Sequence, residues 1–434
     1  MLSLTDLYHK FLACTGVSTD TRQITPDCLF VALKGPSFDG NQFVADAFAK
    51  GARYALVDNA DVAAAHPDRC LLTTDSLTTL QDLARHHRRT LTIPVVGLTG
   101  SNGKTTTKEL IAAVLSRRYV TYATRGNFNN HIGVPLTLLA LNDTHEMAVV
   151  EMGANHQREI ALLSAIAEPS HGLITNIGKA HLEGFGGLEG VRIGKGELYD
   201  FLAQTGGTVF VNGGDATLRA MHGERSGFGE TVVYPDQLPP DFAPTLVAET
   251  PVVTYRTGTG QNVTTHLPGR YNFDNMAAAL AIGHHFGVTA EEAHRAIADY
   301  NPTNNRSQVV SKGTNTVLLD AYNANPSSMA AAVQQFMALP APRKVVILGD
   351  MYELGDDSPA EHAALGELVA RGNFDVVILA GVDMKYALGA LPQAYYFPDK
   401  FSLHNWLMDH PMEHTHVLVK GSRGMGLESV VPFI

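Results

Sequence analysis

A glycine-rich segment with lysines and several hydroxyl groups lies at residues 97–109, GLTGSNGKTTTKE. A loop that binds phosphate needs small residues whose backbone N–H groups converge on the oxygens, a lysine for the outer phosphates and a hydroxyl group for Mg²⁺. Gly100, Gly103, Lys104 and Thr105 supply these groups. The residues that we expect to contact ATP in this segment are Thr99, Gly100, Ser101, Asn102, Gly103, Lys104, Thr105 and Thr106.

The surroundings of this segment support the same interpretation. The apolar run at 95–98 is typical of a strand and ELIAAVLSRR at 109–118 is compatible with a helix, which is the order that a phosphate loop requires. Leu98 stands where the common pattern has its first glycine, so the motif is a variant. A glycine turn that contains a lysine by chance is the alternative.

Three residues with metal- or phosphate-binding side chains follow in the same region. Glu151 ends the apolar run MAVVE, and a carboxylate at a strand's carboxyl end beside a phosphate loop is well placed to hold Mg²⁺. A solvated acid is the alternative. His181 follows another strand-like run, although a lone histidine is more often structural. Lys195, in IGKGELY, is by composition simply a surface lysine.

Two amides near the middle of the chain suit a nucleotide, and an arginine follows them. Asn272 and Asn275, in GRYNFDN, carry groups that donate and accept together, as an adenine or ribose edge requires. On the residues alone, Arg306, in TNNRSQ, is an exposed loop arginine.

The C-terminal part places polar residues where strands end, and ligands of a doubly wound sheet gather at such ends. In DAYNANPSSM, at 320–329, Asp320 and Asn323 are predicted to contact adenosine or the phosphate region across a domain cleft. Asn325 has a helix cap as its alternative role. Further polar residues at these strand ends are Tyr322, Asp350, Glu353, Lys420, Ser422 and Arg423.

The elements that must position these residues form an α/β protein of three domains. A chain of 434 residues is too long for one hydrophobic core. Apolar runs typical of parallel strands recur at 147–151, 172–177 and 208–212, and again as TVLLDAY, KVVILGD, DVVILAG and HVLVKGS, with helix-length segments between them. We predict a small α/β domain at 1–88, a central phosphate-loop ATPase-type domain with a mostly parallel sheet at 89–306, and a C-terminal Rossmann-like domain at 307–434.

Composition excludes several classes of protein. With 43 acidic and 32 basic residues the formal net charge is -11, and a nucleic-acid binder would usually show a basic stripe. The chain shows neither a basic segment before its first apolar residues nor an apolar run of roughly 20 residues, so we expect a cytoplasmic protein rather than a membrane protein. Its cysteines have no metal-like spacing and are expected to be reduced: Cys14, Cys28 and Cys70.

Several long motifs in order carry a resemblance to the Mur ligase family, which assembles the peptide of bacterial peptidoglycan. They extend from about residue 19 to the C-terminus: TGSNGKTTTKE, TRGNFNNHIGVPLTLL, EMGANHQREI, ITNIGKAHLEGFG, DAYNANPSSM, LGDMYELG and KGSRGMGLE. Within the family the chain resembles the branch that adds D-alanyl-D-alanine to UDP-N-acetylmuramoyl-tripeptide. This implies an ATP-dependent acid–amino-acid ligase that forms the UDP-linked pentapeptide through an acyl phosphate.

The resemblance also implies roles for individual residues in the ATP site. His181 matches a histidine at a second Mg²⁺, and Lys195 matches a lysine that CO₂ converts to a carbamate ligand of that metal. Arg306 matches an arginine near the γ-phosphate. Tyr271 departs from the family's usual histidine. The residues expected to act in catalysis are Lys104, Lys195, His181 and Arg306, and those expected to hold two Mg²⁺ ions are Thr105, Glu151, His181 and carbamylated Lys195.

The two other substrates are expected at the outer domains. The residues predicted to hold the UDP-linked precursor are Asp20, Thr21, Arg22, Phe30, Lys34, Gly35, Asp39 and Gly40. Asn41 stands where a common variant has histidine. The residues predicted for the dipeptide, whose carboxylate is expected at Lys420 or Arg423, are Tyr322, Asn325, Lys420, Ser422 and Arg423.

Three alternatives remain at this point. A sister ligase would add one amino acid to the same precursor, but YNANPSSM and LGDMYELG favour the dipeptide branch. A folylpolyglutamate-synthase-like ligase would share the fold and the ATP loop without needing a UDP-binding domain. A nucleotide-gated binding module without catalysis would usually have lost several of the polar groups named above. We expect a monomer.

Overall fold

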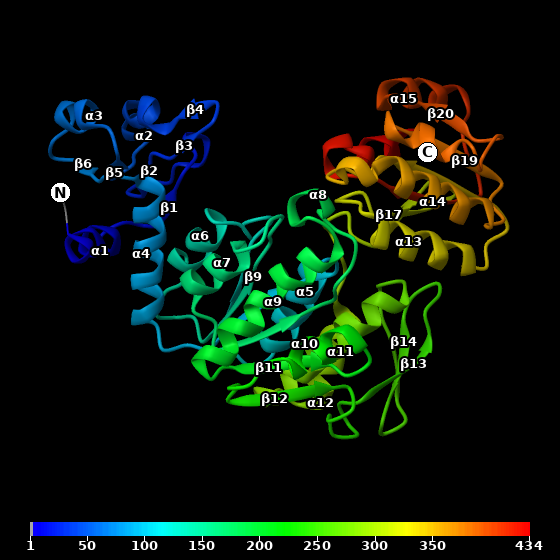
Figure 1. The fold of residues 1–434 in the computed structure, drawn as a ribbon, viewed down its shortest axis with the longest axis horizontal. Helices are drawn as coiled ribbons and strands as arrows, with labels where there is room; N and C mark the ends of the chain where they lie inside the picture. The colour runs from blue at the N-terminus through cyan, green and yellow to red at the C-terminus, as the bar shows by residue number, and fades with distance from the viewer. Residues whose placement is uncertain (1–2) are drawn as a thin grey trace.

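The structure of the protein is a computed structural model that describes residues 3–434. Three β-sheets, each flanked by helices, form three successive domains, which confirms the predicted three-domain α/β architecture. The N-terminal and C-terminal domains both rest on the middle domain and stand apart from each other (Figure 1). Within the described residues, no helix is long and apolar enough to cross a membrane. Cys14, Cys28 and Cys70 are all free thiols.

The N-terminal domain is a parallel sheet of four short strands with a small hairpin beside it. The sheet order is β1-β2-β5-β6. Its strands are β1 (Val17–Ser18), β2 (Leu29–Val31), β5 (Tyr54–Val57) and β6 (Cys70–Leu72), and the hairpin is β3 (Lys34–Gly35) with β4 (Phe38–Asp39). The helices are α1 (Leu4–Leu12), α2 (Val44–Ala49), α3 (Ala60–Ala65) and α4 (Ser76–Thr90), with short turns η1 (Thr21–Gln23) and η2 (Gly40–Phe43).

Helix α4 attaches this domain firmly to the next one. Its Leu80 and Leu83 belong to one apolar cluster with Leu56 of the first domain and Leu138 of the middle domain. The predicted boundary at residue 88 therefore falls inside a packed helix rather than in a loop. Because burial of such side chains is the main stabilising force, we infer that the first two domains are joined by a shared core.

The middle domain is built on six parallel strands in the order β12-β11-β10-β7-β9-β8. Helices α5 and α11 share an apolar cluster on one face of the sheet, and α7 and α9 share another cluster on the other face. A sheet covered on both faces needs continuous apolar strands, which explains why 95–98, 147–151 and 208–212 are recognisable in the sequence.

The strands of this sheet are β7 (Val95–Thr99), β8 (Thr121–Ala123), β9 (Met147–Glu151), β10 (His171–Ile174), β11 (Thr208–Asn212) and β12 (Glu230–Tyr234). The helices are α5 (Lys104–Leu115), α6 (Gly133–Leu139), α7 (Glu159–Ala167), α8 (Leu182–Phe185), α9 (Leu188–Thr205), α10 (Ala216–Gly223), α11 (Arg270–His285) and α12 (Ala290–Asp299).

Two features of this domain differ from the sequence prediction. The helix after the phosphate loop begins at Lys104, earlier than the run from 109, because Gly103 with φ of 79° ends the loop directly before it. A second, antiparallel sheet was not predicted; it consists of β13 (Pro244–Ala248), β14 (Thr254–Thr257) and β15 (Asn262–Thr264). These strands are short and half exposed, so they lack the apolar runs of the main sheet.

The C-terminal domain is a six-stranded sheet in the order β16-β17-β21-β18-β19-β20, in which only β16 runs antiparallel to its neighbour. Its strands are β16 (Gln308–Lys312), β17 (Asn315–Leu319), β18 (Lys344–Gly349), β19 (Val376–Ala380), β20 (Tyr395–Phe397) and β21 (His416–Lys420). Its helices are α13 (Pro326–Ala338), α14 (Ser358–Ala370) and α15 (Lys400–Asp409), with short turns η3 (Gly355–Asp357), η4 (Asp383–Ala387), η5 (Arg423–Met425) and η6 (Leu427–Phe433).

The packing of α11 on α5 leads to a test of what supports the phosphate loop. Leu280 of α11 is fully buried in one cluster with Leu110 and Ile111 of α5. We expect Leu280→Ala to lower the free energy of unfolding by about 2–5 kcal/mol, because the substitution leaves a cavity. Calorimetric unfolding would measure this, and the transition that ADP shifts upward identifies the middle domain. Leu12→Ala, at a residue 58% exposed, is the matched control and should change little. Equal effects of the two substitutions would contradict the packing argument.

Candidate active site

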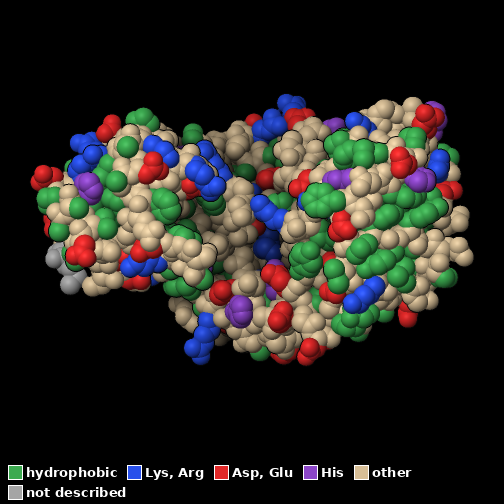
Figure 2. All heavy atoms as spheres, turned by 90° about the horizontal axis from the view of Figure 1, so that it is seen from above, with side chains coloured by type: hydrophobic (Ala, Val, Ile, Leu, Met, Phe, Trp, Pro, Cys, Tyr) green, Lys and Arg blue, Asp and Glu red, His purple; other side chains and the backbone are tan. Residues whose placement is uncertain are grey.

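A cavity of about 1090 Å³ lies between the middle and C-terminal domains. Its walls come from the loops that follow β7, β9 and β10 on one side and β17, β18 and β21 on the other. These are the carboxyl ends of parallel strands, where ligands of such sheets bind. Of the described residues that line the cavity, none belongs to the N-terminal domain. Figure 2 shows the hollow between the outer lobes, with basic side chains near it.

The phosphate loop is held in place by the segment after β10. Ser101 Oγ donates to Gly178 O at 3.0 Å, and the backbone N–H of Asn102 donates to Asn176 Oδ1 at 3.0 Å. Gly100 has a φ of 146°, and a Cβ there would lie 2.0 Å from Thr175 Oγ1. The loop therefore depends on glycine for its close approach to β10 as well as for its conformation.

Lys104 folds back over this loop. Its Nζ donates to Gly100 O at 2.6 Å and to Ser101 O at 3.1 Å. Burial lowers the pKa of Lys104 to about 8; the Glu151 carboxylate opposes this shift, and the positive charge of Arg306 adds to it. The site therefore holds a lysine whose charged form is poorly stabilised in the ligand-free protein, as expected where a phosphate is to bind.

Glu151 places a buried carboxylate beside the loop, with Lys108 Nζ 4.0 Å from its Oε2. Its Oε1 accepts from Thr105 Oγ1 at 3.2 Å and from Asn129 Nδ2 at 2.8 Å, whereas its Oε2 is buried without a hydrogen-bond partner. A carboxylate oxygen next to a hydroxyl group fits a hard cation such as Mg²⁺. Asn129 lies in the motif TRGNFNNHIG, but the sequence did not single it out.

The described residues contain no group of three or more His, Cys, Asp or Glu side chains arranged to hold a metal ion. Mg²⁺ in phosphoryl-transfer sites is usually held by one or two carboxylates together with water and substrate phosphates. Glu151 and Thr105 fit such an arrangement.

The two residues predicted for a second metal lie apart from this pair. His181 lines the cavity directly before α8, and its Nδ1 contacts Glu353 of the C-terminal domain. Lys195, in α9, is 1% exposed and is not among the lining residues of the cavity. Its Nζ donates to Ala154 O at 2.9 Å and lies 4.9 Å from the centroid of the Phe185 ring.

The buried position of Lys195 affects its charge. Burial holds the pKa of Lys195 well below its ordinary value, and the positive charge of Lys104 adds to this effect. A neutral amine is nucleophilic, whereas an ammonium group is not. This environment is therefore chemically suited to the addition of CO₂.

The predicted adenine ligands are engaged with one another. Thr107 Oγ1 donates to Asn275 Oδ1 at 2.9 Å, Asn275 Nδ2 donates to Asn272 Oδ1 at 3.1 Å, and Asn272 Nδ2 donates to Pro268 O at 2.7 Å. Both asparagines line the cavity from the first turns of α11. A Cβ at Gly103 would lie 2.8 Å from Asn275 Oδ1. Asn275 therefore also packs against the phosphate loop and supports it.

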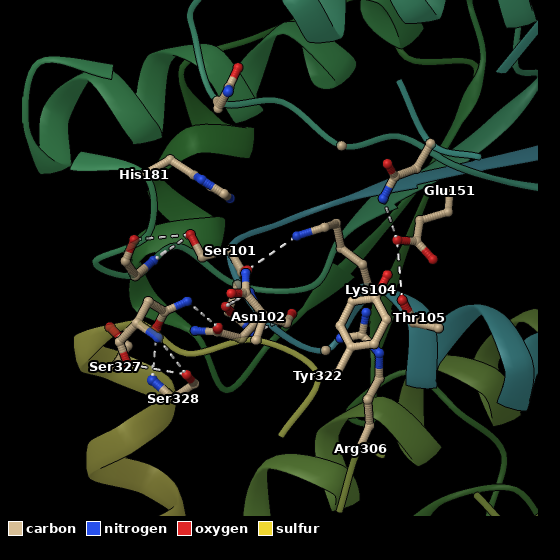
Figure 3. Close-up of a pocket in the computed structure, with 18 of the residues that line it drawn as sticks. Ser101, Asn102, Lys104, Thr105, Glu151, His181, Arg306, Tyr322, Ser327 and Ser328 are labelled. Carbon is tan, nitrogen blue, oxygen red and sulfur yellow. Dashed lines mark hydrogen bonds between the residues drawn. The ribbon is translucent and has the colours of Figure 1, made fainter. Parts of the chain in front are cut away.

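Two arginines approach the ring of Tyr322. The guanidinium carbon of Arg306 lies 3.6 Å from the ring centroid and that of Arg423 lies 4.7 Å from it. Arg423 also donates to the Tyr322 hydroxyl. Figure 3 shows Arg306 and Tyr322 close to Lys104 and Thr105, and the Nε of Arg306 is buried without a partner.

The other predicted residues of the C-terminal domain have structural partners. Lys420 is buried and forms an ion pair with Asp320, and its Nζ also donates to Asn323 O at 3.2 Å. Ser422 Oγ accepts from the Tyr352 N–H at 2.9 Å. Of the two cations predicted for the dipeptide carboxylate, Arg423 is therefore the exposed one.

Asn325 does two things at the start of α13. Its Oδ1 accepts from the Ser328 N–H at 2.9 Å, so the alternative role as a helix cap is confirmed. Its Nδ2 donates to Asn102 Oδ1 of the phosphate loop at 2.8 Å, and Ser327 Oγ accepts from the Lys179 N–H at 2.8 Å. The amino end of α13 is thus docked onto the phosphate loop.

The residues predicted for the UDP-linked precursor lie together in the N-terminal domain, away from the cavity. Arg22 forms an ion pair with Asp20 at 2.7 Å, which lowers the pKa of Asp20 to about 2, and Lys34 forms one with Asp58 at 2.8 Å. Thr21 is the first residue of the short turn η1, and Asp20 is the N-cap of that turn. Asp39 accepts from the N–H and the side chain of Asn41.

One of these predicted contacts needs correction. Phe30 is only 2% exposed and belongs to the core of the domain, so it packs the sheet instead of facing a ligand. A Cβ at Gly40 would lie 2.6 Å from Leu33 O, and a Cβ at Gly35 would lie 2.3 Å from the Phe38 ring. These two glycines therefore permit close packing within the domain itself.

Comparison with known proteins gives the family. Three family models match the chain: "Mur ligase family, catalytic domain" at residues 13–88, "Mur ligase middle domain" at 98–283, and "Mur ligase, glutamate ligase domain" at 305–423. A UDP-N-acetylmuramoyl-tripeptide–D-alanyl-D-alanine ligase from Escherichia coli (strain K12) is 38% identical over 437 residues, 98% of this chain and 95% of that protein. The ligase of the same name from Bacillus subtilis (strain 168) is 36% identical over 426 residues, 96% of this chain and 92% of that protein. The chain belongs to the Mur ligase family, in its MurF branch.

A solved MurF structure agrees in overall shape. The MurF ligase from Thermotoga maritima in complex with ADP has a TM-score of 0.84 and 26% sequence identity, covering 100% of this chain and 98% of that chain. For this MurF-branch protein, the relative with bound ADP supports nucleotide binding.

The lowered pKa of Lys104 gives a testable pH dependence. Its folded-state pKa of about 8 is below the ordinary 10.5, so below pH 8 the amine already carries its proton and nucleotide affinity should be flat. Above pH 8 nucleotide binding must take up a proton, so affinity should fall as pH rises, approaching tenfold per pH unit. Titration calorimetry with ADP between pH 7.5 and 9.5 measures this.

Lys104→Arg is the matched control for this experiment. Arginine keeps its charge throughout the pH range, so the affinity of this variant should not change with pH, whatever its absolute value. A wild-type affinity that does not vary with pH, or a slope that persists in Lys104→Arg, would contradict the assignment.

Proposed function

We infer that this protein is an ATP-dependent ligase that adds D-alanyl-D-alanine to UDP-N-acetylmuramoyl-tripeptide in peptidoglycan synthesis. The observation that carries this inference is the similarity over nearly the whole chain to ligases named for this activity. The phosphate loop, Glu151 and Arg306 line one interdomain cavity, as a phosphoryl-transfer site requires. The one-amino-acid and folate-type alternatives lack comparable support, and a ligand-gated module without catalysis would not need this set of groups.

The reaction that we propose proceeds through an acyl phosphate. An oxygen of the tripeptide carboxylate attacks the γ-phosphorus of ATP, and the bond to the ADP oxygen breaks. The dipeptide amine then attacks the acyl carbon, phosphate leaves, and the nitrogen loses a proton. Lys104 and Arg306 would stabilise the charge on the transferred group, since both face the same cavity.

Two Mg²⁺ ions are part of the proposal. Thr105 and Glu151 would hold one ion. His181 with carbamylated Lys195 would hold the other; of these two, His181 lines the cavity, whereas Lys195 Nζ contacts Ala154 O beside it. Mg²⁺ supplies neutralisation of the phosphate oxygens when it is bound. Glu353 would orient the His181 ring through Nδ1, which leaves Nε2 free to act as a ligand.

The proposed ligase activity also requires the outer domains to bind the two other substrates. We propose that the N-terminal residues Asp20, Arg22 and Lys34 hold the UDP end of the precursor, and that Tyr322 and Arg423 meet the dipeptide carboxylate. The N-terminal domain contributes no described residue to the cavity and shares a core with the middle domain, so the precursor would have to reach from it to the ATP site. We also propose that the protein acts as a cytoplasmic monomer.

The activity is tested by phosphate release from ATP. We expect release with UDP-N-acetylmuramoyl-tripeptide to require D-alanyl-D-alanine, with the product confirmed by a mass gain of one dipeptide less water. D-Alanine and L-alanine alone are the matched controls and should give background rates. Turnover with a single amino acid would reject the dipeptide assignment, and no turnover with any acceptor would reject the UDP-precursor assignment.

The carbamate of Lys195 has its own test. Burial lowers the pKa of Lys195, which favours the neutral amine, and the reaction of that amine with CO₂ forms an N–C bond and releases one proton. We expect ¹³C-bicarbonate to give a carbamate signal by NMR that Lys195→Ala lacks. Turnover should fall about 10- to 100-fold in that variant, the usual effect of losing a group that supports a metal. Lys50→Ala, at an exposed lysine, should keep both signal and activity. A signal that persists without Lys195 would refute this role.

A further inference from the structure

The segment that carries Arg306 has an unusual backbone. Arg306 lies between Asn305, with a φ of 56°, and Ser307, with a φ of 48°. Positive φ angles are uncommon for residues other than glycine, although asparagine adopts them more readily, and contacts with the surroundings stabilise them. The direction of the Arg306 side chain therefore depends on the groups that bind residues 300–307, the linker between the middle and C-terminal domains.

The C-terminal side of this linker is bound by residues already assigned to the site. The Ser307 N–H donates to Asp320 Oδ1 at 3.0 Å, and the Tyr322 N–H donates to Asn305 O at 3.2 Å. The Tyr271 hydroxyl lies 2.9 Å from Ser307 Oγ. Tyr271, which departs from the family's usual histidine, thus contacts the linker.

The other side of the linker is bound by Glu109, a residue of the phosphate-loop motif without a role so far. Asn304 Nδ2 donates to Glu109 Oε1 at 3.1 Å and to Oε2 at 3.0 Å, and the Tyr300 hydroxyl donates to Oε2. Glu109 belongs to α5, the helix that begins at Lys104. One rigid helix therefore carries both the phosphate-binding lysine and the anchor of the linker.

We propose that Glu109 is a positioning residue that holds the linker so that Arg306 reaches the same phosphate group as Lys104. Arg306 lines the cavity, and its Nε is buried without a partner, which leaves it ready for an anionic ligand. The proposal rests on the proposed function only in taking the terminal phosphate of ATP as that ligand. Glu109 itself is not among the residues that line the cavity.

A double-mutant cycle on nucleotide binding tests the proposal without the UDP-linked precursor. The Kd values of ADP and of a non-hydrolysable ATP analogue would be measured with Mg²⁺ for the wild type, Glu109→Ala, Arg306→Ala and the double variant. We expect Glu109→Ala to reduce the preference for the ATP analogue about tenfold, a size usual for coupled neighbours. In the Arg306→Ala background the same change should have almost no further effect. Glu109→Gln, which keeps one acceptor oxygen, should retain most of the preference.

Asp299→Ala is the matched control. The Asp299 side chain forms an ion pair with Arg117 at 2.9 Å, which joins the end of α12 to the turn after α5. Only the backbone carbonyl of Asp299 contacts the linker, at Asn301, and the alanine variant keeps that carbonyl. This variant should behave like the wild type. If Glu109→Ala fails to fold, as judged by thermal unfolding, Asn304→Ala removes the same contact from the linker side and should show the same loss.

Several results would overturn the proposal. Additive effects of Glu109→Ala and Arg306→Ala would mean that Glu109 acts independently of the arginine. The proposal would also be overturned if Glu109→Ala kept the wild-type preference for the ATP analogue over ADP, or if the wild type itself had no such preference. Failure of the ligase assay in the wild type would reject the proposed function alone, because the binding cycle still decides the role of Glu109.

Discussion

The structure depends on holding two cationic side chains, Lys104 and Arg306, close together in the absence of the anionic phosphate that would stabilise them. Burial lowers the pKa of Lys104 to about 8, and the nearby charge of Arg306 acts in the same direction. Two like charges in a partly desolvated cavity repel each other, so the protein must hold them there by other contacts. Those contacts are the ones that define the architecture: the phosphate loop fixed against β10, and the linker fixed to α5.

This requirement explains why the site lies between domains. A single sheet edge supplies Lys104, Thr105 and Glu151, but the opposing cation comes from the linker, and Tyr322, on which that cation stacks, comes from the C-terminal domain. The docking of α13 on the phosphate loop through Asn325 and Ser327 adds neutral hydrogen bonds across the same interface. Ion pairs also cross this interface, between Lys179 and Glu361 and between His181 and Glu353.

Much of the fold could be predicted from the sequence because its main sheets are buried on both faces. Strands such as 147–151 and 208–212 are continuous apolar runs, and the helix at 76–90 has a clear amphipathic pattern. The antiparallel strands β13–β15 lack that signal because half of their residues are exposed. The phosphate loop was predictable because its chemistry leaves little choice of residue type.

The finer geometry of the site could not be predicted, because it depends on partners that are distant in sequence. Phe30 and Phe38 are both phenylalanines near a predicted binding turn, yet one is buried in the core and the other is 54% exposed. Lys420 and Arg423 are three residues apart, and only the ion pair with Asp320 separates their roles. Glu109 looked like an ordinary acid at the end of a motif, since its partners Tyr300 and Asn304 lie about 190 residues further along the chain. A motif therefore identifies which groups meet the phosphate, whereas the fold decides which residues make those groups point toward it.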